Sequence, residues 1–142
     1  MSHADIETRI LHLLESDAKA SIAELADRAG VSKPTVRKYI NKLEEDGVVV
    51  GYAAEVDPKK LSGQTIALVG MDVASERYVE ATRALQRVDA IESLFTSSGG
   101  HMLMAEVRAP NGDALGDVIS DELLAIEGVT AVHPAILQER LK

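Results

Sequence analysis

The stretch Ser32-Lys33-Pro34-Thr35-Val36-Arg37-Lys38-Tyr39-Ile40-Asn41-Lys42-Leu43 decides how the first part of this chain folds. It carries four basic residues and no acidic one. Ser32 is a suitable helix N-cap, and Pro34 is tolerated in a first turn, where backbone N–H groups lack helical partners. The stretch therefore predicts a helix that begins here.

At helical spacing this helix has an apolar side and a charged side. The apolar side holds Val36, Tyr39, Ile40 and Leu43, which we expect to pack inward. The outward residues are Pro34, Thr35, Arg37, Lys38, Asn41 and Lys42. One side packs, and the other presents positive charge.

The whole chain of 142 residues is acidic, with a net charge of −8 and a pI of about 4.9. This charge alone argues against a nucleic-acid partner. Charges separated by more than about 10 Å are largely screened at ordinary ionic strength, so a local basic face can still attract phosphate. One hypothesis for the acidity elsewhere is a high-salt cytosol, where an acidic surface keeps a protein hydrated.

Composition narrows the class of protein further. There is no Cys, which excludes a disulfide framework, a thiolate metal site and a cysteine nucleophile. No apolar run approaches membrane-spanning length, and residues 1–5 lack the charged and apolar parts of a signal peptide. We expect a cytoplasmic protein without a membrane partner.

Two further helices are predicted before Ser32. Apolar residues at helical spacing between Asp5 and Ser16 predict the first, and the capping box Ser21-Ile22-Ala23-Glu24 starts the second. Gly30 closes the second helix, and a short turn that contains Gly is typical of a helix-turn-helix. Val48–Tyr52 is predicted to be a strand that forms the wing of a winged helix. Residues 1–52 are therefore expected to be a DNA-binding domain.

The remaining chain predicts a second domain. Residues 53–64 are expected to be a linker, because the segment from Asp57 to Gly63 is turn-rich. Residues 65–142 predict the order strand, helix, strand, strand, helix, strand, which is the ferredoxin-like βαββαβ pattern. The strands are expected at 65–74, 90–96, 101–108 and 129–137, and the helices at 76–87 and 113–126. The fold class is α+β.

A four-stranded sheet with helices on one face leaves its other face bare. We expect a second subunit to bury that face, because monomers seldom expose large apolar patches. The residues predicted to lie on it are Val69, Met71, Met102, Met104 and Ile136.

The sequence resembles the Lrp/AsnC family, the "feast/famine" transcription regulators of bacteria and archaea. Three segments carry the resemblance in the N-terminal part: residues 5–11 (Asp-Ile-Glu-Thr-Arg-Ile-Leu), 22–26 (Ile-Ala-Glu-Leu-Ala) and 30–32 (Gly-Val-Ser). It continues through residues 43–52 (Leu-Glu-Glu-Asp-Gly-Val-Val-Val-Gly-Tyr). The family implies a winged helix-turn-helix joined to an effector-binding domain that forms dimers and often octamers.

The resemblance also implies an effector site, and the chain departs from the family pattern there. Members commonly carry Gly-x-Tyr-Asp in the turn before the third strand, where this chain has Gly99-Gly100-His101-Met102. The missing carboxylate removes the obvious partner for an amino group, whereas the two Gly residues can still offer N–H groups to a carboxylate. The effector-binding residues are expected to be Gly99, Gly100, His101, Met102 and His133.

No residue pattern predicts catalysis. The sequence has no Ser/His/Asp order, P-loop or Gly-x-Gly-x-x-Gly. His101 and His133 invite a metal hypothesis, but zinc usually needs three or four ligands, so no metal site is expected. We therefore predict a protein that is not an enzyme and has no cofactor apart from a small-metabolite effector such as an amino acid.

The main hypothesis is a transcription regulator, expected in amino-acid or related metabolism, with an effector at subunit interfaces. As a homodimer or octamer it would bind double-stranded promoter DNA at a near-palindromic site, because each subunit places one helix in the major groove. The predicted contact residues are Ser32, Lys33, Thr35, Arg37, Lys38, Asn41 and Lys42. The alternative is a metabolite-binding or enzymatic ferredoxin-like protein whose N-terminal helices mediate protein contacts.

Overall fold

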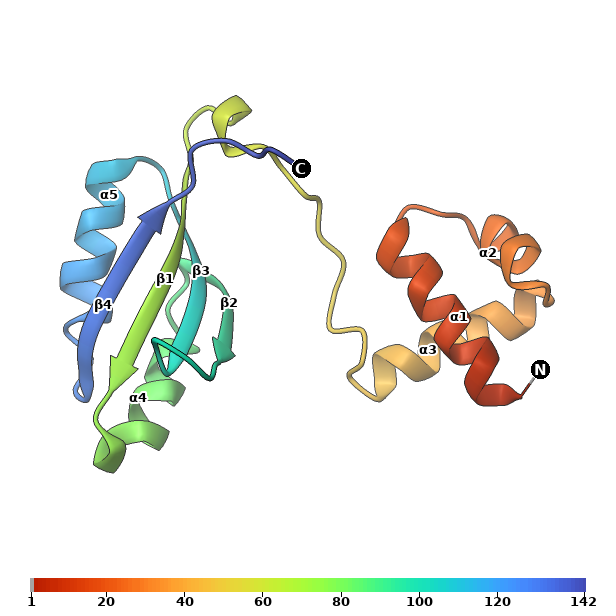
Figure 1. Cartoon of the computed structure of the whole chain (residues 1–142), viewed down its shortest axis with the longest axis horizontal. Coiled ribbons are helices and arrows are strands. Elements are labelled where there is room, and N and C mark those ends of the chain that lie inside the picture. The colour runs from red at the N-terminus through yellow and green to blue at the C-terminus, as the bar shows by residue number, and fades with distance from the viewer. Residues whose placement is uncertain (1) are drawn as a thin grey trace. The chain divides into compact units, whose positions relative to one another are not determined.

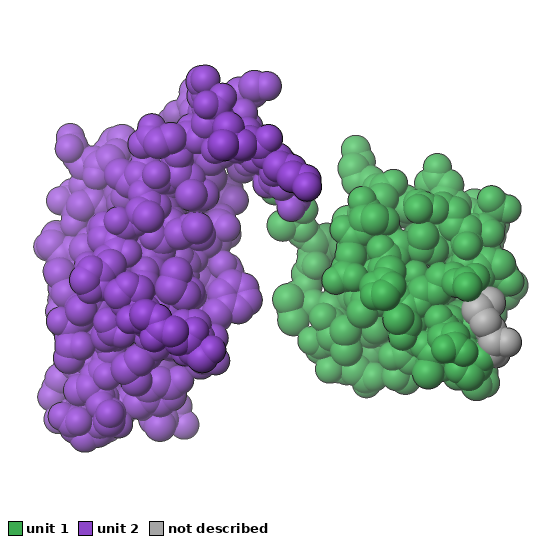
Figure 2. Space-filling model, viewed as in Figure 1, with its two compact units in different colours: residues 1–54 green, residues 55–142 purple. Residues whose placement is uncertain are grey.

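The computed structural model describes residues 2–142, which divide into two compact units (Figures 1 and 2). The first ends at Ala54, and the second begins at Glu55. Each unit has its own apolar core. Across residues 2–142, no helix combines the length and the apolar character needed to cross a membrane.

The first unit contains the three predicted helices, α1 (His3–Ser16), α2 (Ile22–Ala29) and α3 (Lys33–Glu45). All three begin with a serine N-cap whose hydroxyl accepts a backbone N–H three residues later, and at α1 and α2 an acid completes a capping box. Their inward sides form one core of Ile10, Leu14, Leu25, Ala26, Ala29, Val36, Tyr39 and Leu43.

Helices α2 and α3 end in the same way. Gly30 and Gly47 adopt left-handed φ angles of 71° and 70°. The N–H group of Val31 donates to the Ala26 carbonyl at 3.0 Å, and that of Val48 donates to the Leu43 carbonyl at 2.9 Å. These are Schellman-type ends, which favour a residue without a Cβ at the left-handed position.

The predicted wing strand at Val48–Tyr52 is wrong for this structure. Every residue from 46 to 64 is described, and none of them lies in a strand. Val48 and Val49 instead direct their N–H groups back to the Leu43 carbonyl, and Tyr52 donates its hydroxyl to Glu44 at 2.8 Å. A strand needs a paired neighbour, and the described part of the first unit supplies none.

The second unit is built on one antiparallel sheet with strand order β2-β3-β1-β4. The strands are β1 (Thr65–Val73), β2 (Ile91–Thr96), β3 (Leu103–Ala109) and β4 (Val129–Ile136). Helix α4 (Tyr78–Leu85) joins β1 to β2, and α5 (Gly112–Asp117), continued by a π-helix from Val118 to Leu123, joins β3 to β4. This order confirms the predicted βαββαβ fold.

Both helical segments cover the same face of the sheet (Figure 1). That face carries the odd-numbered residues of β1 and β3, because successive strand residues point to opposite faces. Ala81, Leu85, Leu115 and Leu123 pack there against Ala67, Val69, Met71, Val73, Leu103, Ala105, Val107 and Ala109.

This packing corrects part of the predicted bare face. Val69 and Met71 are fully buried in the helix-covered core, and Ile136 pairs with Ala67, whose side chain also points to the helices. Met104 lies on the opposite face, where it pairs with Gly70 and Phe95. Strand β1 is apolar at both parities, so its sequence alone does not show which side meets the helices.

The chain enters the second unit beside its own C-terminal segment. A short 3₁₀ turn (Pro58–Lys60) begins at Asp57, whose carboxylate accepts the Arg140 N–H at 3.1 Å. Lys59 pairs with Glu139 at 3.1 Å, and Arg140 pairs with Glu55 at 3.1 Å. The start and the end of this unit are therefore tied together.

Strand β4 lies at one edge of the sheet, and it contains Pro134 opposite Val69. Leu137, just past the strand, donates its N–H to the Ile66 carbonyl at 2.9 Å. Alternate residues of a strand direct their N–H groups to the same side. The N–H groups of residues 135, 133 and 131 therefore also point toward β1, as that of Leu137 does. The missing N–H of Pro134 thus falls on the outer side of the edge.

Candidate nucleic-acid interface and ligand site

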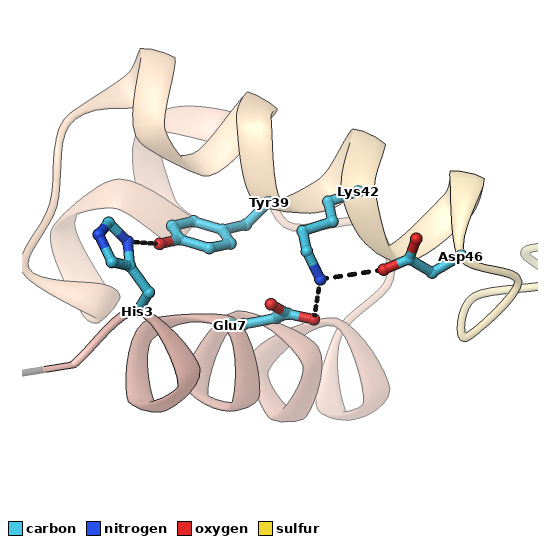
Figure 3. Close-up of polar contacts among 5 residues, drawn as sticks. All are labelled: His3, Glu7, Tyr39, Lys42 and Asp46. Atoms are coloured by element: carbon cyan, nitrogen blue, oxygen red, sulfur yellow. Dashed lines mark hydrogen bonds and ion pairs between the residues drawn. The ribbon is translucent and has the colours of Figure 1, made fainter.

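Helix α3 is held in place by its buried side. Val36, Tyr39 and Leu43 are almost completely inaccessible to solvent. The Tyr39 hydroxyl also forms a hydrogen bond with His3 Nδ1 of α1 (Figure 3). Packing and this polar contact fix the rotation of α3 about its own axis, which determines the residues that it presents outward.

The outward side of α3 is positively charged. Lys33, Arg37, Lys38 and Asn41 are all exposed. Among residues 2–142, Lys33, Arg37 and Lys38 take part in none of the ion pairs that the structure contains. Arg and Lys can donate to guanine or phosphate, and Asn can pair with adenine, so this surface has the chemistry for reading DNA.

Lys42 differs from the other basic residues of α3. Its Nζ lies 3.0 Å from a Glu7 carboxylate oxygen and 2.9 Å from one of Asp46 (Figure 3). The hydrogen bonds to Asp46 and Glu7 raise the pKa of Lys42 above its usual value. Its charge is already paired, so it braces α3 against α1 and is the least available of the predicted DNA contacts.

Ser32 and Thr35 lie together at the start of α3. Their hydroxyl oxygens are 2.8 Å apart, and Ser32 Oγ accepts the Thr35 N–H at 3.3 Å. Ser32 is exposed and Thr35 is half-buried. Both hydroxyls therefore serve the helix start, where partial positive charge also favours a phosphate.

In the second unit, the structure brings His101 and His133 together. Their rings stack with centroids 4.7 Å apart and an interplanar angle of 27°. His101 Nδ1 also lies 3.1 Å from Asp72 Oδ2. Sequence reasoning missed Asp72, although an acid in the otherwise apolar strand β1 is a signal that could have identified it.

Gly70 makes room for this cluster, which we call the Asp72–His101–His133 cluster. Gly70 pairs with His133 across the sheet, and the His101 ring lies directly over it. A Cβ at Gly70 would fall 2.7 Å from His101 Cγ, which is too close for two carbon atoms. Only glycine allows the ring to lie against β1.

The turn predicted to bind the effector lies beside this cluster. The Ser97 N–H donates to the Met102 carbonyl at 2.9 Å, and the Ser97 hydroxyl donates to the His101 carbonyl at 2.6 Å. Gly99 and Gly100 at the tip are exposed. The Met102 N–H donates to Asp72 Oδ1 at 3.1 Å, which joins the turn to β1.

The electrostatics of Asp72 follow from these contacts. The hydrogen bond with His101 and then the one from the Met102 N–H lower the pKa of Asp72 below its usual value. Asp72 is thus held as a carboxylate, with Oδ1 bound to the backbone and Oδ2 facing the imidazole.

Each of the two units matches a known protein family. The family described as "Winged helix-turn-helix DNA-binding" matches residues 4–50, and the "Lrp/AsnC ligand binding domain" matches residues 66–142. The HTH-type transcriptional regulator LrpA1 of Halobacterium salinarum is 71% identical over 142 residues, which is 100% of both chains. LrpA of Pyrococcus horikoshii is 39% identical over 94% of each chain.

Solved structures show the same architecture. The leucine response regulatory protein of Mycobacterium tuberculosis superposes with a TM-score of 0.78 at 25% identity, covering 97% of this chain and 94% of that one. AsnC of E. coli gives a TM-score of 0.70 at 23% identity, over 97% and 93% of the two chains, and supports the fold.

Fold, site and relatives define a DNA-binding transcription regulator that is modulated by a small-molecule effector. The chain belongs to the Lrp/AsnC family.

Proposed function

We propose that a homodimer of this chain places two α3 helices in successive major grooves of a near-palindromic promoter site. The exposed side of α3 carries this proposal, because Lys33, Arg37, Lys38 and Asn41 project from a rigidly packed helix with no acidic residue between them. Ser32 and Thr35 are proposed phosphate contacts at the helix start, and Lys42 is a secondary contact. A regulator that binds promoter DNA acts where that DNA is, so we place it in the cytoplasm.

Dimerisation is proposed through the helix-free face of the sheet. Leu68 and Phe95 are 44% and 62% exposed there, and Met102 is 36% exposed. Together with Met104, they are apolar side chains that a second copy can cover, and the Glu106–Arg108 ion pair lies among them. Because one helix offers few cations, DNA affinity depends on two subunits binding at once, and assembly into an octamer would multiply the contacts further.

The effector is proposed to be an amino acid or a related metabolite that binds near Gly99, Gly100, His101, Met102 and His133 at a subunit interface. The Gly99 and Gly100 N–H groups suit a carboxylate. One solved neighbour, NMB0573 of Neisseria meningitidis, is described as an L-Met complex; at 20% identity and a TM-score of 0.74 over 100% of this chain and 92% of that chain, it shows the shared fold. An effector would act by binding one assembly more tightly than another.

The DNA proposal is tested with the double variant Arg37→Ala/Lys38→Ala and DNA from upstream of the protein's own gene. Each interaction of this kind is worth about 1–3 kcal/mol, so the loss of two should lower the affinity at least about 30-fold. The dependence of log K on log salt should also become shallower, by about 1 for each phosphate that the variant no longer neutralises.

The matched control is Arg83→Ala/Arg87→Ala, which removes the same charge from exposed positions of the second unit. It should leave DNA affinity nearly unchanged, and sedimentation should show the same assembly for both variants. Equal losses of affinity in the two variants, or full affinity in Arg37→Ala/Lys38→Ala, would reject α3 as the DNA-reading helix. In that case the metabolite-binding alternative would be favoured.

A further inference from the structure

We propose that Asp72, His101 and His133 form a binding site for a divalent transition-metal ion of the zinc class. Each residue offers one ligand atom, and these atoms lie within 4.8 Å of one another. Zinc bonds to nitrogen and oxygen of about 2.0–2.1 Å place tetrahedral ligand atoms roughly 3.3–3.4 Å apart. The three atoms therefore need to approach by at most about 1.5 Å, which side-chain rotation can supply.

The three ligands come from separate elements that the sheet holds in register. Asp72 lies in the central strand β1, His133 in its neighbour β4, and His101 just before β3. All three side chains are on the helix-free face, since His133 pairs with Gly70 and the His101 ring covers Gly70. The backbone of the site is thus fixed by strand pairing rather than by a flexible loop.

The groups around the ligands hold them in position. The Met102 N–H binds Asp72 Oδ1, which leaves Oδ2 directed toward the imidazole of His101. Gly70 provides the space in which that ring lies. Groups that orient metal ligands in this way commonly alter metal affinity by about 10- to 100-fold when they are changed.

The ligand set selects the class of metal. Imidazole suits zinc, copper, nickel and iron, whereas magnesium and calcium prefer sites made of oxygen atoms. Three protein ligands leave a further coordination position open for water or another donor. In the single chain the side chains of Asp72 and His101 are 30% and 31% exposed, and His133 is exposed, so an ion can reach the ligand atoms before a second copy covers this face.

The test is a Zn²⁺ titration of the untagged full chain, because a polyhistidine tag would bind the ion itself. Calorimetry with Zn²⁺, followed by the visible absorption of Co²⁺ as a substitute, should show about one ion per chain and imidazole ligation. Mg²⁺ should bind at least about 100-fold more weakly, as expected for a hard cation at a nitrogen-containing site.

Four variants locate the site. Asp72→Asn and His133→Ala each remove one ligand and should weaken Zn²⁺ binding by at least about 100-fold, more than the loss of an orienting group. Gly70→Ala keeps every ligand but displaces the His101 ring, so a loss of about 10- to 100-fold is expected. His12→Ala removes an exposed histidine of α1 and is the matched control, which should bind as the wild type does.

Each alternative outcome overturns the proposal. Absence of Zn²⁺ binding by the folded wild-type chain would mean that the cluster is only a stacked, hydrogen-bonded group. Equal affinity in wild type and His133→Ala, with intact circular dichroism, would place the bound ion elsewhere. Neither result depends on DNA, so failure here is distinguishable from failure of the proposed regulatory function.

Discussion

The two units differ in the distance along the chain between the residues whose hydrogen bonds begin, end or pair their helices and strands. In the first unit, each helix starts with a bond between residues three apart, and α2 and α3 end within a few residues of a left-handed glycine. In the second unit, β1 pairs with β3 and β4 across long separations, and Asp72 lies near His101 and His133 because of this strand pairing. Local sequence therefore specifies the first unit more completely than the second.

The largest expected effect on stability comes from truncating a buried leucine side chain in either core. Leu43 and Leu85 are 1% and 0% exposed, one in each unit. Leu43→Ala and Leu85→Ala should each lower the free energy of unfolding by about 2–5 kcal/mol, the usual cost of deleting a buried Leu side chain. Hydrogen exchange of the full chain should show reduced protection only in the unit that carries the substitution.

Reduced protection in both units from a single substitution would show that the two cores unfold as one. Leu141→Ala serves as the control, because Leu141 is 91% exposed and its truncation should change exchange in neither unit.

Replacing a helix N-cap should cause a smaller loss of stability, of similar size in the two units. Ser32 caps α3, and Asn111 caps α5 by accepting the Ala114 N–H at 2.8 Å. Ser32→Ala and Asn111→Ala should each cost about 1 kcal/mol of stability, measured by urea unfolding, because an N–H group loses its acceptor. Only Ser32→Ala should also weaken DNA binding.

The conservative variant Ser32→Asn separates the two roles of Ser32, which caps α3 and is a proposed phosphate contact. Asn caps a helix as well as Ser does, so stability should return to within a few tenths of a kcal/mol of the wild type. If Ser32→Ala leaves both stability and DNA affinity unchanged, the first turn of α3 is held by other contacts.

The smallest expected effect is a dependence on acidic pH. Hydrogen bonds lower the pKa of Asp5, from the Ser2 side chain, and of Asp72, from His101 and the Met102 N–H. A carboxyl group with a lowered folded pKa adds stability above its unfolded value near 3.8, and this is lost as the pH falls through the folded pKa. Carboxyl-carbon NMR titration should therefore show both groups titrating below that value.

Single substitutions identify the partners in that titration. Ser2→Ala should raise the pKa of Asp5 alone, and His101→Ala should raise that of Asp72 alone. A shift of both carboxyl groups in either variant would contradict the separate origins of the two contacts.

The sequence predicts elements that depend on local signals better than elements that depend on distant partners. The three helices were predictable because Ser21, Ser32 and Gly30 are local signals with local partners. The strand predicted at Val48–Tyr52 is wrong because apolar β-branched residues favour a strand but do not supply its partner.

In the second unit, the order of helices and strands was predictable from the sequence. Which strand residues lie on the helix-covered face of the sheet was not. The predicted bare face wrongly includes Val69 and Met71, because β1 is apolar on both sides and its sequence does not distinguish them. Within the candidate site, His101 and His133 were identified from the sequence, but their approach to Asp72 depends on strand register and on the absence of a side chain at Gly70. Register is a long-range property that one sequence does not display.

Pro134 has a consequence for how copies of this chain can join. Its missing N–H lies on the outer side of β4, so a strand added at this edge would lack a ladder hydrogen bond. Continuous sheet growth from β4 is thereby discouraged, which guards crowded copies of the chain against open-ended fibre formation. The proposed dimer uses the broad face of the sheet instead, and an interface of that kind can stop at a closed assembly.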